Sequence, residues 1–385
     1  MNDRRQQDWD PRAEEVLSDQ LAAYDRMRQR CPVAFSDYLQ WSLFRHEDVM
    51  RVLDDHETFS NAASRHLSVP NAMDPPDHTY FRRIIEPYFA TEPMAAFEPR
   101  CRAIAADVVD RLPEKGIVDA MTVLGQDFAL EIQCAFMGWP ESLHEPLRAW
   151  VQRQQAATLA GDREALGELA LEFDGVIRQQ LATRREPGEQ APDDVTTRLM
   201  NESVEGRPLS DEEIVSIMRN WTVGELGTIS ASIGILIGYL ARHPELQERL
   251  RDDAGLLPAA IDEILRLDAP LMSNRRVATC PVEIGGRHLE AGERLTILWG
   301  AANRDEAVFE DPEVFRLDRN PDDNLLYGAG IHVCPGAPLA RMELLHFMAA
   351  LFEKTRWLSG TDGHPGTRAR YPAGGYASLP VEVSC

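Results

Sequence analysis

The stretch LYGAGIHVCPGAPLARME fills positions 326–343 and holds the most distinctive pattern in the chain. Its single cysteine, Cys334, follows a glycine-rich segment and precedes an apolar segment whose composition suits a helix. Gly328, Gly330 and Gly336 lie close together here, and glycines allow a backbone to turn tightly and to approach a flat ligand closely. The pattern therefore predicts a tight loop that presents Cys334 near the start of a helix.

A cysteine in such a loop favours metal chemistry. Backbone amides and the positive end of a helix stabilise a thiolate, and a lone thiolate held in this way suits an axial ligand of haem iron. His332 precedes the cysteine by two positions and could place a cation beside a haem propionate. The alternative is a buried structural cysteine in a glycine-rich turn, since free cysteines often behave as small core residues.

This stretch resembles the haem-binding loop of cytochromes P450, whose pattern is F-x-x-G-x-H-x-C-x-G-x-x-L-A-R. The matching positions are Gly330, His332, Cys334, Gly336, Leu339, Ala340 and Arg341. Tyr327 stands where the family usually has phenylalanine, and Pro335 removes one amide donor beside the sulfur. The resemblance implies that Cys334 is the axial ligand of haem b and that Gly328 and Gly336 shape the loop around the cofactor.

A second segment, MDPPDHTYFRRII at positions 73–85, resembles another motif of the same family. Its prolines favour the start of a helix, and His78 and Arg82, four positions apart, would share one face of that helix. Taken alone, a histidine and an arginine at this spacing usually lie on a solvent-exposed face of a helix. The family's D-P-P-x-H-x-x-x-R segment binds a haem propionate through its histidine and arginine, so the resemblance assigns that role to His78 and Arg82.

A long central helix is predicted after Ser210, which forms a capping box with Glu213. No proline follows until Pro244, so the helix could run for about 32 residues, or roughly 48 Å. Gly224 and Gly227 in its middle cost about 1 kcal/mol each relative to alanine. A stable fold tolerates such glycines where a ligand must approach the backbone closely.

This helix resembles the family's long helix over the haem, with Gly224 and Thr228 matching G-x-x-x-T. The resemblance implies that Gly224 borders the haem and that the Thr228 hydroxyl assists oxygen activation and proton delivery. The family usually has an acid directly before this threonine, where this chain has Gly227. Glu225 is the nearest acid and would supply protons through water, while Gly227 would leave room for substrate. The alternative is a glycine-kinked core helix in which Thr228 bonds back to its own backbone.

Two further motifs support the resemblance. Glu263 and Arg266 match the family's E-x-x-R pair, a structural ion pair that locks the core beside the haem loop. Arg316 or Arg319 would complete its salt-bridge network. Another basic position, Arg276, resembles the residue that pairs with a haem propionate, with Arg275 as the second choice.

Hydrophobic periodicity predicts the remaining elements. Residues 94–185 are helix-rich, with Phe128, Ile132, Phe136 and Trp139 as a core stripe, and residues 186–195 form a polar loop. The other expected elements are a helix over Glu14–Arg30, strands at Val33–Phe35 and Gln40–Phe44, a helix over His46–Leu53, a hairpin of Val282–Arg287 with Leu295–Leu298, and a turn and strand over 374–381.

Composition restricts the class of protein. A formal net charge of -23 and a pI near 4.8 disfavour nucleic acids and anionic membranes as partners. The six cysteines are scattered and form no C-x-x-C pair, which predicts reduced thiols in a cytoplasm. The charged start of the sequence, without an apolar segment behind it, predicts no signal peptide and no membrane anchor. We expect one haem domain over residues 1–385, with a β-containing lobe over roughly 1–70, a helix-rich remainder and no fused reductase.

The resemblance implies a mainly α fold with a small β region, in which haem lies between the long central helix and the cysteine loop. It also implies a monooxygenase that inserts one atom of O2 into a small hydrophobic or aromatic substrate by hydroxylation, O-demethylation or epoxidation. No nicotinamide, flavin or iron–sulfur motif is evident, so a separate ferredoxin with its NAD(P)H reductase would supply electrons. The substrate pocket would be lined by Val223, Leu226, Gly227, Leu271, Met272 and Tyr376.

Two alternative functions remain open at this point. Because Gly227 replaces the usual acid, the chain could instead be a non-catalytic haem-binding sensor. It could also be a peroxide-driven or reductive haem-thiolate enzyme, which Thr228 argues against.

Overall fold

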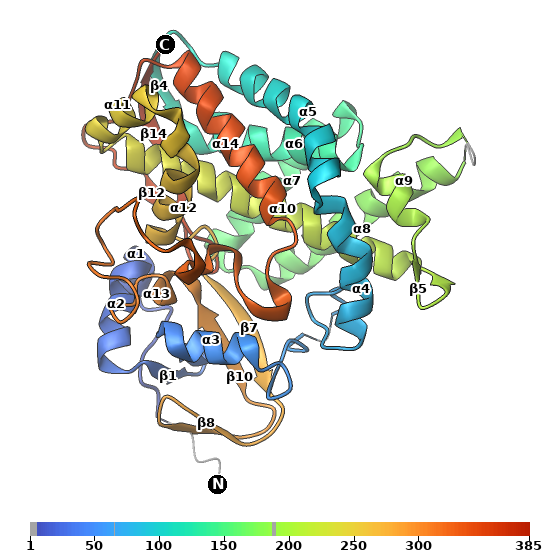
Figure 1. Cartoon of the computed structure of the whole chain (residues 1–385), viewed down its shortest axis with the longest axis vertical. Helices are drawn as coiled ribbons and strands as arrows, with labels where there is room; N and C mark the ends of the chain where they lie inside the picture. Colours follow the sequence, from blue (N-terminus) through green and yellow to red (C-terminus); the bar gives the residue numbers. More distant parts are fainter. Residues whose placement is uncertain (1–5, 65, 187–189) are drawn as a thin grey trace.

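The computed structural model describes residues 6–64, 66–186 and 190–385, which form a helical body and a smaller, sheet-containing lobe (Figure 1). The lobe packs its sheet against two hydrophobic clusters of its own, while one larger cluster fills the helical body. The predicted class, mainly α with a small β region, is confirmed.

The main sheet joins segments from both ends of the chain. Strands β1 (Val33–Ser36) and β2 (Gln40–Leu43) form an antiparallel hairpin, and β2 runs parallel to β10 (Arg294–Leu298). Strand β10 pairs with β7 (Ser273–Ala278), which pairs in turn with β3 (Phe59–Ser60). The order is β1-β2-β10-β7-β3, so the lobe needs late strands as well as the first 70 residues.

Two helices were predicted in the lobe, and the structure confirms one of them. Helix α3 (His46–Asp54) is present as expected, but the single helix predicted over Glu14–Arg30 is wrong. It is divided into α1 (Glu14–Ser18) and α2 (Gln20–Arg30) by Asp19. Asp19 has a non-helical backbone, and its carboxylate accepts a hydrogen bond from the amide of Ala22. The aspartate thus starts a new helix as an N-cap instead of continuing the old one.

One predicted strand pairing is wrong. Strand β8 (Val282–Ile284) pairs with β9 (Arg287–Leu289), whereas Leu295–Leu298 lies within β10 of the main sheet. The turn between β8 and β9 consists of Gly285 and Gly286, both with positive φ. Two such residues form the tight hairpin turn that suits twisted strands, so the nearer segment becomes the partner.

The helical body contains α4 (Asp77–Ile85), α5 (Thr91–Asp110), α6 (Asp127–Met137), α7 (His144–Ala160), α8 (Arg163–Arg185), α9 (Val195–Met200), α10 (Asp211–Leu240), α11 (Pro244–Asp252), α12 (Leu257–Leu267) and α14 (Ala337–Lys354), with the short α13 (Trp299–Ala302) beside the lobe. The predicted core stripe Phe128, Ile132, Phe136 and Trp139 is buried. Of the predicted polar loop, residues 187–189 lie outside the described residues.

Small sheets complete the body. Strands β11 (Trp357–Gly360), β14 (Pro380–Ser384) and β4 (Lys115–Asp119) form one antiparallel sheet. Two short hairpins pair β5 (Ser203–Val204) with β6 (Arg207–Pro208), and β12 (Thr367–Arg368) with β13 (Tyr376–Ser378). The turn and strand predicted near the end of the chain are therefore confirmed.

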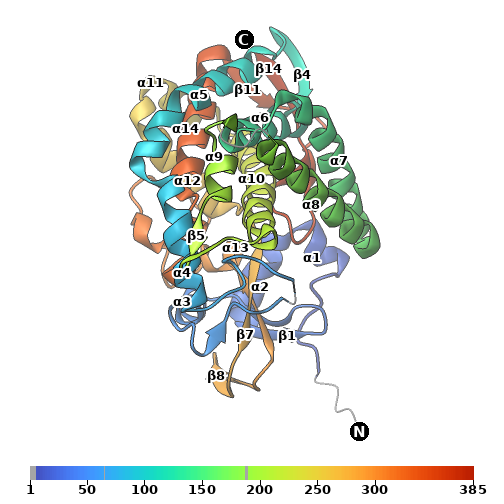
Figure 2. The ribbon, with the colours of Figure 1, turned by 90° about the vertical axis from the view of Figure 1, so that its right-hand side faces the viewer.

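Helix α10 passes through the centre of the body (Figure 2). The predicted capping box is present, since the Ser210 hydroxyl accepts from the Glu213 amide and the Glu213 carboxylate accepts from the Ser210 amide. The helix has 30 residues, close to the expected length. By length and composition it could cross a membrane, but 67% of its most apolar window is buried inside the fold, as in a core helix.

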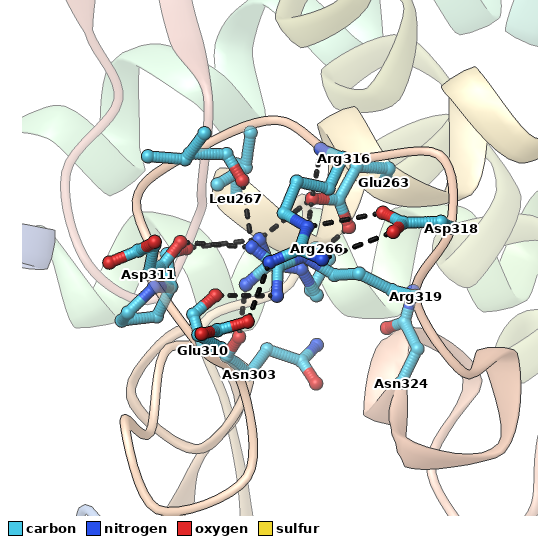
Figure 3. A network of polar contacts seen from close by, with 12 residues as sticks. Glu263, Arg266, Leu267, Asn303, Glu310, Asp311, Arg316, Asp318, Arg319 and Asn324 are labelled. Atoms are coloured by element: carbon cyan, nitrogen blue, oxygen red, sulfur yellow. Dashed lines mark hydrogen bonds and ion pairs between the residues drawn. The ribbon is translucent and has the colours of Figure 1, made fainter.

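A buried ion-pair network fixes the segment ahead of the cysteine loop (Figure 3). Arg266 donates two hydrogen bonds to Glu263, at 2.7 and 2.9 Å, and Arg319 donates a third at 2.9 Å. Arg316 reaches Glu263 only through its backbone amide, so Arg319 is the arginine that completes the network. Arg266 also donates to the carbonyl of Asn303, whose side chain accepts from the amide of Leu325. The network thereby anchors the chain just before residue 326.

Candidate active site

The cysteine loop has the tight geometry that its glycines predict. Gly328 and Gly330 adopt positive φ, and a Cβ on Gly330 would lie 2.5 Å from the carbonyl oxygen of Leu53 in α3. The Cys334 amide donates to the carbonyl of Tyr327 at 2.9 Å, which closes the loop. Helix α14 begins three residues after the cysteine, with Gly336 as its N-cap.

The Cys334 thiol lies where backbone amides reach it. Its side chain is accessible yet surrounded by protein, as a residue on a cavity wall is. Burial raises the pKa of the Cys334 thiol, whereas the amides of Gly336 and Ala337 act in the opposite direction. Although Pro335 has no N–H, the next two residues therefore supply the donors that a thiolate ligand needs.

Four basic side chains gather beside this loop. The rings of His78 and His332 lie 4.2 Å apart, and Arg82 donates to the carbonyl of Val333 at 2.8 Å. Arg276 is buried and near enough to His332 to act on it electrostatically. Burial first, then the neighbouring cations, lowers the pKa of His78 to about 4 and that of His332 to about 3. Arg275, the second choice, faces away from this cluster.

Three ring nitrogens of this cluster lack a partner among the described residues. Both ring nitrogens of His78 and the Nε2 of His332 are buried without any hydrogen bond among the described residues. Among the residues that the structure describes, Arg276 donates to the neighbouring carbonyl of Arg275 alone, at 2.8 Å, and burial lowers its pKa to about 10. Buried polar groups without partners are rare in native proteins, so this cluster is suited to a bound anion.

One face of α10 is open. Val223 is 37% exposed, and a Cβ added at Gly224 or Gly227 would meet no atom within 4 Å. The Thr228 hydroxyl lies at the edge of this face and donates to the Gly224 carbonyl at 2.8 Å. This is the hydrogen bond from Thr228 to its own helix that the alternative of a glycine-kinked core helix predicts. It also holds the hydroxyl oxygen at a fixed position, with its lone pairs free to accept.

A haem fits this set of residues. Cys334 supplies a thiol with amide donors, and the glycines of α10 supply an apolar face without side chains for a flat ring. The unpartnered nitrogens of His78 and His332, with Arg276, supply the donors that propionates require. These three features lie on separate segments of the chain that the fold brings together.

Comparison with known proteins supports the same cofactor. The family model "Cytochrome P450" matches residues 143–371. The chain belongs to the cytochrome P450 family. Its sequence is 30% identical over 339 residues to the cyclomarin C epoxidase CymV of Salinispora arenicola, covering 82% of this chain and 83% of that protein.

Two further relatives agree. The erythromycin C-12 hydroxylase of Saccharopolyspora erythraea is 28% identical over 345 residues, covering 85% of each chain. The structure of cytochrome P450 CYP109Q5 from Chondromyces apiculatus superposes with a TM-score of 0.86 at 26% identity, covering 97% of each chain. This P450 is therefore a haem-binding oxidoreductase of the monooxygenase class. Bacterial P450s of this type usually depend on redox partners, O2 and an organic substrate.

Sequence reasoning missed one buried acid, Glu343 on α14. It is fully buried, and its carboxyl group meets that of Glu225 on α10 at hydrogen-bonding range. No other described group bonds to the Glu343 oxygens. Burial raises the pKa of both carboxyl groups, that of Glu225 to about 7. Ionisation of both carboxyl groups at once is unfavourable, because two adjacent negative charges in a buried site repel each other.

The predicted pocket residues divide into two groups. Val223, Gly227 and Leu271 present open surface. Leu226 and Met272, in contrast, are buried in hydrophobic clusters, because neighbouring positions on a helix or strand point in different directions. The assignment of Leu226 and Met272 to the pocket stays a prediction.

Tyr376, the last of the predicted pocket residues, packs farther along α10, and its assignment to the pocket stays a prediction. Its ring packs against α10 at Gly238, about 15 Å along the helix from Thr228 at the usual rise. Its hydroxyl accepts a hydrogen bond from Arg242 at 2.9 Å, which holds the side chain at that end of the helix. Ala373, three residues before Tyr376, bridges to Leu271.

Proposed function

We propose that this P450 oxidises a small organic molecule with a hydrophobic or aromatic body, by hydroxylation, O-demethylation or epoxidation. The observation that carries the proposal is the open face of α10, where Gly224, Gly227 and Thr228 border free space. A substrate body and a flat cofactor can both approach the backbone there. The relatives named as an epoxidase and a hydroxylase favour this class of reaction.

The cofactor in this proposal is haem b. When bound, it supplies the oxidising chemistry, and the protein positions and tunes it. Cys334 would hold the iron, with the amides of Gly336 and Ala337 partly balancing the thiolate charge. His78, His332 and Arg276 would donate to the propionates, and Arg82 would fix the loop through Val333.

Protons would pass through residues of α10 and α14. Thr228 offers a hydroxyl at the edge of the open face, and Glu225 lies one helical turn before it. Because burial raises the pKa of both Glu225 and Glu343, the pair would hold a proton inside the fold. The pair would thus supply the protons that the family's usual acid supplies from the position of Gly227.

Electrons would come from a ferredoxin with its NAD(P)H reductase, in the cytoplasm. The chain shows no flavin or nicotinamide motif of its own, and the expected organisation is one haem domain without a fused reductase. A direct test supplies the purified protein with a surrogate ferredoxin, its reductase, NADPH and 18O-labelled O2 together with a panel of apolar compounds. We expect one labelled oxygen atom in each product molecule.

The same assay separates the alternatives. Unlabelled product, or product formed only with added peroxide, would contradict the O2-dependent reaction and favour a peroxide-driven enzyme. Electron consumption without product across the panel, in a protein that binds haem normally, would favour a sensor.

A further inference from the structure

An aromatic cluster lies beside the open face of α10. Trp221 of α10 is its central member, and its ring centroid lies 5.5 Å from that of Tyr88 and 5.3 Å from that of Phe89. Tyr88 and Phe89 belong to the short 3-10 helix Glu86–Phe89, which follows α4. Both are buried, whereas Trp221 is only half-buried. Part of the indole is therefore accessible, as expected of a residue that borders free space.

The stripe of α10 that carries Trp221 also carries Thr228. Seven positions separate the two residues, which is close to two turns, so their side chains project from one side of the helix about 10 Å apart. Gly224 lies between them along the helix, with open space where a side chain would be. Trp221 is thus placed at the end of the open face, where the proposed function puts a flat cofactor.

A second ring connects Trp221 with the cysteine loop. A Cβ added at Gly336 would lie 3.8 Å from the Phe89 ring and 3.8 Å from the Cys334 sulfur. Phe89 stacks on Phe136 at 5.6 Å and lies edge-on to Trp221. The indole is therefore linked to the proposed haem site both along α10 and through Phe89.

Tyr88 has a proton acceptor at its hydroxyl. It donates a hydrogen bond of 3.0 Å to a carboxylate oxygen of Glu202, a half-buried residue between α9 and β5. Burial first, then Glu202, raises the pKa of the Tyr88 hydroxyl, so the phenol stays protonated. A phenol that loses an electron becomes a strong acid, and a base within hydrogen-bonding range can take its proton directly.

We propose that Trp221 and Tyr88 form an electron-transfer path that reduces the oxidised haem when no substrate is in place. Indole and phenol rings are among the protein groups that lose an electron most readily, and these two are in contact. This inference rests on the haem site of the proposed function, and it adds a second reaction to that site.

The first step moves one electron and one proton. The oxidant is haem that has lost two electrons to a peracid, or to O2 that the redox partner has reduced. Trp221 gives the haem one electron and recovers it from Tyr88, whose phenolic proton passes to Glu202. Tyr88 is then a neutral phenoxyl radical, and Glu202 is a carboxylic acid.

A small-molecule reductant such as ascorbate completes the cycle. It gives the haem the second electron and gives Tyr88 one electron, and the proton on Glu202 returns to the Tyr88 oxygen. With the peracid as oxidant, the net reaction converts peracid and ascorbate into a carboxylic acid, water and dehydroascorbate. Electrons and atoms therefore balance, and the protein ends unchanged.

The test follows the radical itself. Haem-loaded protein without substrate is mixed with peracetic acid, frozen within milliseconds and examined by electron paramagnetic resonance, with ring-deuterated tyrosine to identify the signal. We expect a tyrosyl radical in the parent protein and its loss in Tyr88→Phe and in Trp221→Phe. Glu202→Gln should slow its formation on the order of 10²-fold, the lower range for a positioned proton-transfer group.

Tyr239 is the control tyrosine on the same helix. It lies about 16 Å beyond Thr228 along α10 and stacks on His243 at 4.0 Å, away from Trp221. Tyr239→Phe should leave the radical signal unchanged. In the parent protein, peptide mapping by mass spectrometry after repeated exposure to peracetic acid should find added oxygen at Trp221 and Tyr88 but not at Tyr239.

Three results would overturn the proposal. One is a tyrosyl radical that survives Tyr88→Phe or Trp221→Phe unchanged. Another is the absence of a protein radical in parent protein whose Soret band shows that the peracid has oxidised the haem. The third is oxidation of the parent protein at other residues only, which needs no variant to fold. The carbon monoxide spectrum of the same samples distinguishes a failure of the haem site, and hence of the proposed function, from a failure of the electron path.

Discussion

Replacing Arg266 with alanine is expected to lower the free energy of unfolding by about 3–5 kcal/mol, because it leaves a buried carboxylate without its main partner. Arg266 is 1% exposed and Glu263 is 5% exposed. Removal of the guanidinium would also free the carbonyls of Asn303 and Pro312. Urea unfolding followed by circular dichroism on the haem-loaded protein measures the change.

A matched control compares the stability lost at this buried ion pair with the stability lost at an exposed ion pair. Arg102 forms an exposed pair with Glu98 on α5 at 2.8 Å, and its replacement by alanine is expected to cost less than about 1 kcal/mol. The double variant Glu263→Leu, Arg266→Leu should recover part of the loss, since no buried charge then remains unpaired. A loss below 1 kcal/mol for Arg266→Ala would show that the network of Figure 3 does not stabilise the loop segment.

Proton delivery is expected to fail when Thr228 becomes alanine. Reductant and O2 should still be consumed, but product per electron should fall on the order of 10²-fold, the lower range for a positioned proton-transfer group. Glu225→Gln should show a smaller loss of the same kind, because Glu343 can still hold a proton beside it. Product yield is measured against NADPH oxidised and hydrogen peroxide released.

Thr222 provides the control on the same helix. Its hydroxyl also bonds back to the helix, to Met218 at 2.9 Å, but it is fully buried and faces Gln133 instead of the open side. Thr222→Ala should lower stability without changing the product yield per electron, and Thr228→Ser should restore the yield. Equal yields in Thr228→Ala and the parent protein would remove Thr228 from the proton route.

Local patterns in the sequence predicted the parts of the site that depend on local structure. The capping box of α10, the tight glycine loop at Cys334 and the shared face of His78 and Arg82 follow from neighbouring residues. Each was therefore visible in the order of amino acids, before any knowledge of which segments meet in space.

Features that depend on contacts between distant segments were not visible. Glu343 is an ordinary helical residue until α14 is placed beside α10, where it meets Glu225. The distance of Tyr376 from Thr228 along α10 was hidden for the same reason, since it depends on where β13 packs.

The most direct test of the haem-thiolate site is the difference spectrum of the reduced protein with and without carbon monoxide, for the parent chain and for Cys334→Ala. The matched control is Cys280→Ala, which removes an exposed cysteine near β8. We expect a strongly red-shifted Soret band in the parent and in Cys280→Ala, and its loss in Cys334→Ala at unchanged helical content. A red-shifted band that persists without Cys334, or no haem band in the parent protein, would contradict the assignment of Cys334 as the iron ligand.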